Sequence, residues 1–186
     1  MDYAKPADVM RTMIDSAGNK LALAPRDLLI RGMLSGALLG AATSLAFTGA
    51  VQTGQPLVGA VIFPVGFIMI VLLGLELVTG SFSLLPLARF EYGASNSKII
   101  ANWGWVFLGN LLGSVLYGAL LAIALTDLGQ IAPTGVAARI IAVAEAKTTG
   151  YAAFGAAGMI TVFVKAMLCN WMASHPAPAP LTTRLP

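Results

Sequence analysis

One short segment of this sequence concentrates the side chains that could do chemistry. Residues 74–86 contain one carboxylic acid, three hydroxyl side chains, two glycines and a proline, and they follow a long apolar run. Non-helical backbone at membrane depth persists only where protein or a water-filled cavity satisfies its polar groups. We therefore predict that the helix breaks over residues 77–83, near Thr79, and resumes from Ser83 to Phe90. Hydroxyls and backbone donors would then face a lumen, as at the substrate sites of transporters with broken helices.

The acid of this segment is Glu76. A charged and unpaired acid at this depth is unfavourable by roughly 2.5–3.5 kcal/mol on insertion scales. We expect Glu76 to cap backbone N–H groups that the break sets free. The alternative is direct contact with a solute, although a carboxylate would repel an anion. Pro64, earlier in the same run, is expected only to kink the helix.

The composition requires a lipid environment. Of the 186 residues, 58% are hydrophobic and 10% are charged, and the mean hydropathy is +0.83. Soluble domains are about one quarter charged, and disordered or coiled-coil chains are more polar still. The net charge of +3 does not indicate nucleic-acid binding, because the basic residues lie mostly between apolar runs.

Enzyme chemistry has no support in the sequence. The chain lacks the GxSxG, HExxH and P-loop patterns, and it has a single histidine and a single cysteine, Cys169. We therefore expect no enzyme, no cofactor and no metal centre.

Four apolar stretches are long enough to cross a bilayer, which takes about twenty helical residues. They cover residues 32–51, 57–90 with the break, 99–126 and 151–173. The prediction is an all-α membrane protein with a membrane domain at 28–173. Residues 1–27 precede it, and a Pro/Ala-rich tail, 174–186, follows it.

Residues 1–27 carry apolar side chains on one helical face and charges on the other. This helix would lie on the membrane surface or pack on the protein's own cytoplasmic face. Eight Lys and Arg residues lie on the side of the N-terminus, against two on the other side. The positive-inside rule then predicts a multi-pass protein of the cell membrane with both termini in the cytoplasm.

Glycine recurs at every fourth position in two spans, at Gly32, Gly36 and Gly40 and at Gly109 and Gly113. Glycine faces let helices approach closely in lipid. They could serve packing within the chain or contacts between subunits.

Three separated motifs resemble the formate/nitrite transporter family. They are Gly74, Glu76, Leu77, Thr79 and Gly80; Asn102-Trp103, Val106 and Gly109-Asn110-Leu111; and Cys169-Asn170-Trp171. The resemblance covers residues 28–171. It implies an aquaporin-like helical bundle of six spans, a homopentamer, and transport of small monovalent anions such as formate or nitrite.

The resemblance also implies which residues form the site. The pore constriction maps to Leu77, Thr79, Gly80, Ser81, Phe82 and Ser83, with Thr79 as the polar contact. A neutral hydroxyl donor holds an oxyanion weakly enough to release it. Lys147 matches the lysine at the extracellular mouth, where a cation attracts anions, and Asn170 matches an asparagine that holds loop backbone. Lys165 is the other candidate for the lysine, or it could snorkel to the membrane boundary.

The resemblance ends early. The family has a fifth span with a pore histidine and a sixth span, whereas this chain turns proline-rich after Trp171 and has four of the six. We do not assign the pore role to His175, which is expected to be an exposed tail residue. We expect a truncated or frameshifted version of a longer protein. If the chain is complete, weak assembly and little or no transport should follow.

Two other functions compete with anion transport. A channel for neutral solutes such as water or glycerol would keep the architecture, but the paired Asn-Pro-Ala signature of aquaporins is absent. A membrane scaffold held together by its glycine faces would transport nothing.

Overall fold

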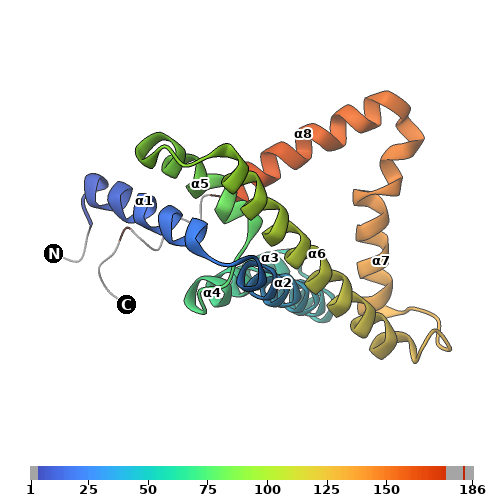
Figure 1. The fold of residues 1–186 in the computed structure, drawn as a ribbon. Coiled ribbons are helices and arrows are strands. Elements are labelled where there is room, and N and C mark those ends of the chain that lie inside the picture. The colour runs from blue at the N-terminus through green and yellow to red at the C-terminus, as the bar shows by residue number, and fades with distance from the viewer. Residues whose placement is uncertain (1–3, 175–181, 183–186) are drawn as a thin grey trace. The chain divides into compact units, whose positions relative to one another are not determined.

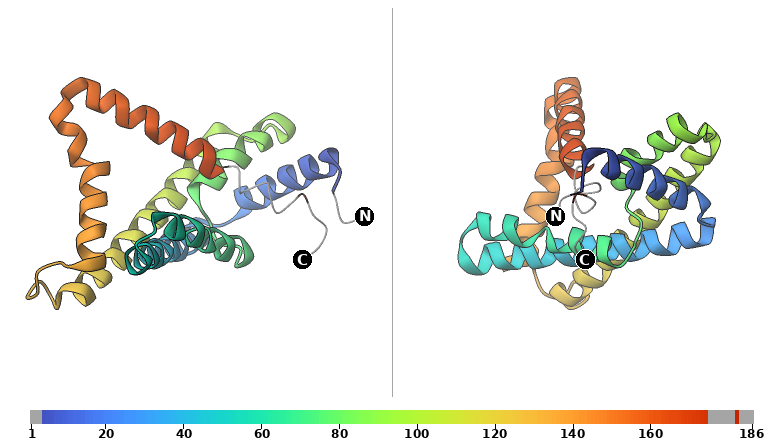
Figure 2. Two further views of the ribbon diagram at one scale, coloured as in Figure 1. Left: turned by 180° about the vertical axis from the view of Figure 1, so that it is seen from behind. Right: turned by 90° about the vertical axis from the view of Figure 1, so that its left-hand side faces the viewer.

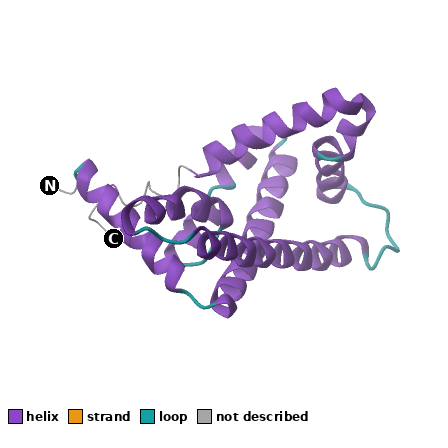
Figure 3. Cartoon of the chain, turned by 45° about the horizontal axis from the view of Figure 1, so that its top comes forward, coloured by secondary structure: helices purple, strands orange, loops and turns teal. Residues whose placement is uncertain are grey.

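The computed structural model describes residues 4–174 and Thr182, and over these residues it contains helices, turns and loops without a strand (Figures 1 and 3). The elements are α1 (Pro6–Ala22), α2 (Pro25–Thr53), α3 (Pro56–Ile62), α4 (Val65–Leu72), α5 (Val78–Tyr92), α6 (Asn96–Thr126), α7 (Gly135–Lys147), the 3₁₀ helix η1 (Thr149–Phe154) and α8 (Gly155–Ser174). His175 and most of the predicted tail lie outside the described residues.

The chain forms two compact units. Unit 1 comprises residues 1–36, 70–113 and 170–186, and unit 2 comprises residues 37–69 and 114–169. Unit 1 contains α1, α5 and the segment predicted to break. Each unit is described by itself below.

Within the described part of the chain, three helical stretches are long and apolar enough to cross a membrane: Pro25–Thr53, Asn96–Thr126 and Gly135–Ser174. Only 17%, 17% and 6% of their most apolar windows are buried by the chain itself. Apolar helices that present most of their surface outward need lipid around them, so this is a helical membrane protein. The stretch Pro56–Leu72 is apolar but shorter.

Residues 127–150, which connect the third and fourth predicted spans, contain the helix α7. Alanine is abundant in this helix and favours helical backbone. The predicted span start at Tyr151 falls in η1. The α-helix α8 begins at Gly155, whose φ of 53° is unfavourable for other residues. In the left view of Figure 2, α7 and α8 are separate rods that meet at a bend.

The core of unit 1 lies between α1 and α5. Ala17 of α1 and Leu84, Leu85 and Ala88 of α5 are buried together with Ile99 of α6. Residues 81, 84, 85 and 88 recur at helical spacing, so one face of α5 is buried. Met13, Ala17 and Leu21 of α1 therefore pack on the protein, as in the second of the two predicted arrangements, whereas the cytoplasmic location of this face stays a prediction.

The glycine faces bring α2 and α6 into backbone contact within unit 1. A Cβ on Gly36 would overlap the carbonyl of Asn110, and a Cβ on Gly113 would overlap the carbonyl of Met33. In unit 2, a Cβ on Gly40 would lie 2.5 Å from the ring of Tyr117. These glycines serve packing within the chain.

Candidate functional site

The helix break lies between α4 and α5, a few residues earlier than predicted. Helix α4 ends at Leu72, and Gly74 adopts a left-handed φ of 62°. The N–H of Leu75 donates to the Ile70 carbonyl at 3.0 Å, and the N–H of Gly74 donates to the Val71 carbonyl at 3.1 Å. This pattern is a Schellman cap, which glycine favours.

The prediction of irregular backbone over 77–83 is therefore wrong in its position. The interruption covers residues 73–77, and the new helix begins at Val78 rather than at Ser83. Leu77 is extended, with φ −120° and ψ 129°, and its carbonyl accepts the first helical bond of α5 from Ser81 N–H at 3.1 Å. Thr79, Gly80, Ser81, Phe82 and Ser83 lie in the first turns of α5. A second interruption, at Phe63–Pro64, separates α3 from α4.

The side chain of Asn110 holds the broken backbone from α6. Its Oδ1 accepts from the N–H of Val78 at 3.0 Å, and its Nδ2 lies 2.9 Å from the carbonyl oxygen of Glu76. The same Nδ2 lies 2.9 Å from the Gly32 carbonyl and 2.8 Å from Ser35 Oγ. Ser35 is fully buried, and its hydroxyl donates to the Glu76 carbonyl. Ser35 of α2 and Asn110 of α6 thus satisfy the two backbone groups that flank Leu77, the carbonyl of Glu76 and the N–H of Val78.

The carboxylate of Glu76 forms an ion pair with Lys20. The Lys20 Nζ to Glu76 Oε2 distance is 2.7 Å, and the exposed fraction of the two side chains is 19% and 4%. Asn102 Nδ2 donates to the carbonyl of Lys20 at 3.0 Å, which fixes the end of α1. Glu76 was expected to cap freed N–H groups, and this is wrong. Asn110 supplies the acceptor for Val78, while Glu76 neutralises a lysine of α1.

The N-terminus of α5 carries hydrogen-bond donors that have no partner among residues 4–174. Thr79 Oγ1 is buried, and it has no hydrogen-bond partner within residues 4–174. The backbone N–H groups of Thr79 and Gly80 also have no recorded acceptor among the described residues. The first N–H groups of a helix lack intrahelical partners and lie at the positive end of its dipole. Donors of this kind are the groups that hydrogen-bond an oxyanion.

The other residues of the predicted constriction differ in their surroundings. Ser81 is fully buried on the face of α5 that packs against α1, and its hydroxyl has no partner in the described part of the chain. Phe82 is 44% exposed and meets the ring of Trp103 edge-on, with 5.0 Å between centroids. The Ser83 hydroxyl donates to the Gly80 carbonyl at 3.1 Å, so its proton is engaged within α5.

The end of α8 contacts the first turn of α5 in unit 1. Ser174 Oγ lies 2.8 Å from the Asn170 carbonyl and 3.3 Å from the Thr79 carbonyl. Ser83 Oγ lies 3.4 Å from the carbonyl of Ser174. The predicted partner Asn170 is thus linked to the α5 backbone through Ser174.

The two candidate lysines belong to unit 2. Lys147 is exposed at the last turn of α7. Lys165 Nζ donates to Tyr151 Oη at 3.1 Å and lies 5.3 Å from the centre of the same ring. The charge of Lys165 is therefore engaged by a cation–π contact with Tyr151.

Sequence reasoning missed the residues that hold the break. Lys20 was counted only as a basic residue, and Asn110 was noted only as part of a motif. A signal existed, because an acid within an apolar span needs a cation. The spacing of residues along the chain could not select Lys20 from the other basic residues near the N-terminus.

The broken apolar helix, its buried ion pair and the unpartnered donors of α5 define a class: a helical membrane protein with polar groups inside an apolar span. A sequence model of the formate/nitrite transporter family matches residues 7–177. The chain therefore belongs to the formate/nitrite transporter family.

Individual relatives agree with this assignment. An uncharacterized transporter, YrhG of Bacillus subtilis (strain 168), is 31% identical over 92% of this chain and 63% of its own length. A probable formate transporter of Methanothermobacter thermautotrophicus is 31% identical over 91% of this chain and 66% of its own length. The formate channel BtFdhC of Bacillus thuringiensis is 26% identical over 92% and 64%. The chain thus spans about two thirds of the length of these relatives.

Proposed function

We propose that this chain is a protomer of a channel or transporter for small monovalent anions, with formate or nitrite as substrate class. The observation that carries the proposal is the open set of donors at the start of α5: the hydroxyl and N–H of Thr79 and the N–H of Gly80. Neutral donors attract an oxyanion without binding it too tightly to pass. The names of two relatives, a probable formate transporter and a formate channel, support the substrate class.

The apolar neighbours of these donors set the form in which the anion crosses. Leu77 precedes the donors, and Phe82 follows them on the same helix. A dry constriction penalises a bare charge. We therefore propose that the anion crosses together with a proton.

The assembly and topology are part of the same proposal. Four spans of an aquaporin-like bundle lie in the cell membrane, with both termini in the cytoplasm, and the protomers form a homopentamer. Lys147 lies at the outer mouth and raises the local anion concentration. Asn170 supports the backbone of α5 through Ser174.

The test is uptake of labelled formate into proteoliposomes, with Thr79→Val as the informative variant. Loss of a hydrogen bond to an anion should lower uptake about tenfold or more. Thr43→Val is the matched control, because the half-buried Thr43 hydroxyl donates to the Leu39 carbonyl of its own helix at 2.7 Å. This control should retain the parent uptake.

Two results would count against the proposal. Equal uptake by Thr79→Val and by the parent would remove the α5 donors from the mechanism. Uptake no greater than that of protein-free vesicles would contradict transport by this chain, and it is the outcome expected if one broken span is insufficient. Osmotic swelling without formate uptake would indicate a neutral-solute channel instead.

A further inference from the structure

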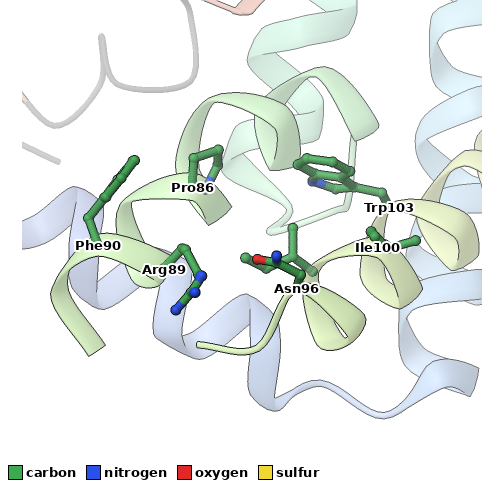
Figure 4. A pocket seen from close by; sticks show the side chains of 7 residues that line it. Pro86, Arg89, Phe90, Asn96, Ile100 and Trp103 are labelled. Carbon is green, nitrogen blue, oxygen red and sulfur yellow. The ribbon is translucent and has the colours of Figure 1, made fainter. Parts of the chain in front are cut away.

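A pocket with a cationic rim lies between the end of α5 and the start of α6, away from the break. Its volume is about 240 Å³. The side chains shown in Figure 4 line it: Pro86, Arg89 and Phe90 from α5, and Asn96, Ile100 and Trp103 from α6. All of them belong to unit 1.

Arg89 is the charged side chain among the residues that line the pocket. Arg89 is exposed and has no recorded hydrogen bond or ion pair within residues 4–174. Glu91 and Lys98 are exposed residues of opposite charge near the pocket, but neither lines it. Each lies two residues, or about 200° of helix, from a lining residue, Arg89 on α5 and Asn96 on α6. The rim therefore favours an anion.

The walls of the pocket are apolar and continuous with the outer surface of the helices. Phe90 is 87% exposed and Ile100 is 62% exposed. Aromatic side chains beside basic residues at the end of an apolar span are typical of the membrane–water interface. A free inorganic anion would leave these walls in contact with water, whereas a lipid would cover them with an acyl chain.

We propose that this pocket binds an anionic phospholipid, with the phosphate at Arg89 and an acyl chain over Phe90 and Ile100. The planar guanidinium fork matches two phosphate oxygens at once. The positive charge of Arg89 also favours an anionic lipid over a zwitterionic one. The proposal requires only that the chain lies in a membrane, so it does not depend on transport activity.

A lipid in the pocket would also affect the start of α5, next to the break, through Trp103. Its Nε1 donates to the Ser81 carbonyl at 3.2 Å, and its ring packs against Phe82. A lipid that fixes Trp103 thereby supports the first turns of α5.

Quenching of Trp103 fluorescence by brominated lipid tests the proposal directly. Trp105→Phe and Trp171→Phe leave Trp103 as the one tryptophan of the chain. The protein is reconstituted in phosphatidylcholine vesicles with increasing amounts of brominated phosphatidylglycerol or, separately, brominated phosphatidylcholine. Phosphatidylglycerol should reach half-maximal quenching at a several-fold lower mole fraction.

The variants decide whether the pocket causes this preference. Arg89→Gln should raise the required fraction of phosphatidylglycerol about tenfold, since a charged hydrogen bond is lost. The fraction of phosphatidylglycerol that Arg89→Lys requires should lie between those of the parent and Arg89→Gln. Arg139→Gln, an exposed arginine of α7, is the matched control and should change nothing.

Three outcomes would overturn the proposal. Equal quenching by both lipids, or no change in Arg89→Gln, would exclude selection by this pocket. Relief of quenching by excess inorganic phosphate would assign the site to a free anion. The surface would instead belong to a contact with a second copy of the chain if two results occur together. The two results are that neither lipid quenches Trp103 and that an Ile100→Cys, Cys169→Ser variant forms disulfide-linked dimers.

Discussion

At the scale of single residues, one carboxamide satisfies the backbone on both sides of the break. Asn110 accepts from the N–H of Val78 and donates toward the carbonyl of Glu76. An amide is suited to this position because it combines a donor and an acceptor on one planar group. The Glu76 carbonyl and the Val78 N–H have no partner within α4 or α5, so each contact from a neighbouring helix replaces one that a continuous helix would have made.

The first prediction follows from the two functions of this amide. Asn110→Asp keeps the acceptor for Val78, but it turns an oxygen toward the three oxygen atoms that the Nδ2 now contacts. Leaving buried acceptors unsatisfied costs roughly 1–3 kcal/mol each. The variant should unfold at a clearly lower temperature in detergent. The control is Asn19→Asp, at an exposed amide of α1, which should unfold at the same temperature as the parent. Equal unfolding midpoints for the two variants would contradict the proposal that Asn110 holds the break.

The second prediction concerns the ion pair between Lys20 and Glu76. Removal of one partner leaves an uncompensated buried charge, which costs about 3–5 kcal/mol. Lys20→Met should therefore lower the unfolding midpoint strongly. The double variant Lys20→Met, Glu76→Gln should recover most of the loss, because no charge is stranded.

A double-mutant cycle measures this coupling. Lys98→Met, which removes an exposed lysine, is the control for loss of charge alone. If Lys20→Met is as mild as Lys98→Met, or if the double variant is no better than the single one, the ion pair does not stabilise the break.

At the scale of elements, α2 and α6 depend on glycine where their backbones meet. Gly113 and Gly118 lie on the same helix, but only Gly113 contacts α2, while Gly118 has open space around it. Gly113→Ala should destabilise the protein by about 1–3 kcal/mol or more through overpacking. Gly118→Ala should be neutral or stabilising by up to about 1 kcal/mol, since alanine favours helix. Thermal unfolding of the two variants compares them, and equal destabilisation would show that close packing is not the cause.

How far the sequence predicts these elements depends on the range of the contacts involved. An acid, two glycines and a proline after an apolar run predicted an interrupted helix, and the structure interrupts it at residues 73–77. Its position was misjudged because Gly74 ends α4 by a local cap, while residues 78–83 are compatible with helix. The hydroxyl residues looked like breakers, but Ser83 donates to a carbonyl of its own helix.

The contacts that hold the break could not be predicted at all. Lys20 lies 56 positions from Glu76, and Asn110 lies 32 positions from Val78. Periodicity places each residue on a helix face, but it does not say which faces meet. The motif that contains Asn110 marked the residue without indicating the Val78 N–H as its partner.

At the scale of the whole molecule, the chain has little core of its own. Most of the large apolar side chains in its long helices are exposed, and the packed contacts gather where α1 meets α5 and where glycines join α2 and α6. Lipid cannot drive such helices together by the hydrophobic effect, so close packing and polar contacts must do so. The stability of unit 1 should therefore respond more to Gly113 and Asn110 than to its exposed leucines.

The last prediction concerns the direction in which the molecule crosses the membrane. The excess of Lys and Arg on the side of the N-terminus predicts that Ser95 faces the cytoplasm, whereas Gln55 and Thr148 face outward. In a Cys169→Ser background, Gln55→Cys and Thr148→Cys should react with a membrane-impermeant maleimide in intact cells. Ser95→Cys should react only after permeabilisation, and since all three residues are exposed, access alone separates them. Labelling of Ser95→Cys in intact cells would show that the topology is reversed. Labelling of Gln55→Cys without labelling of Thr148→Cys would show that the third span does not cross the membrane. If α6 did not cross, Thr148 would remain on the cytoplasmic side.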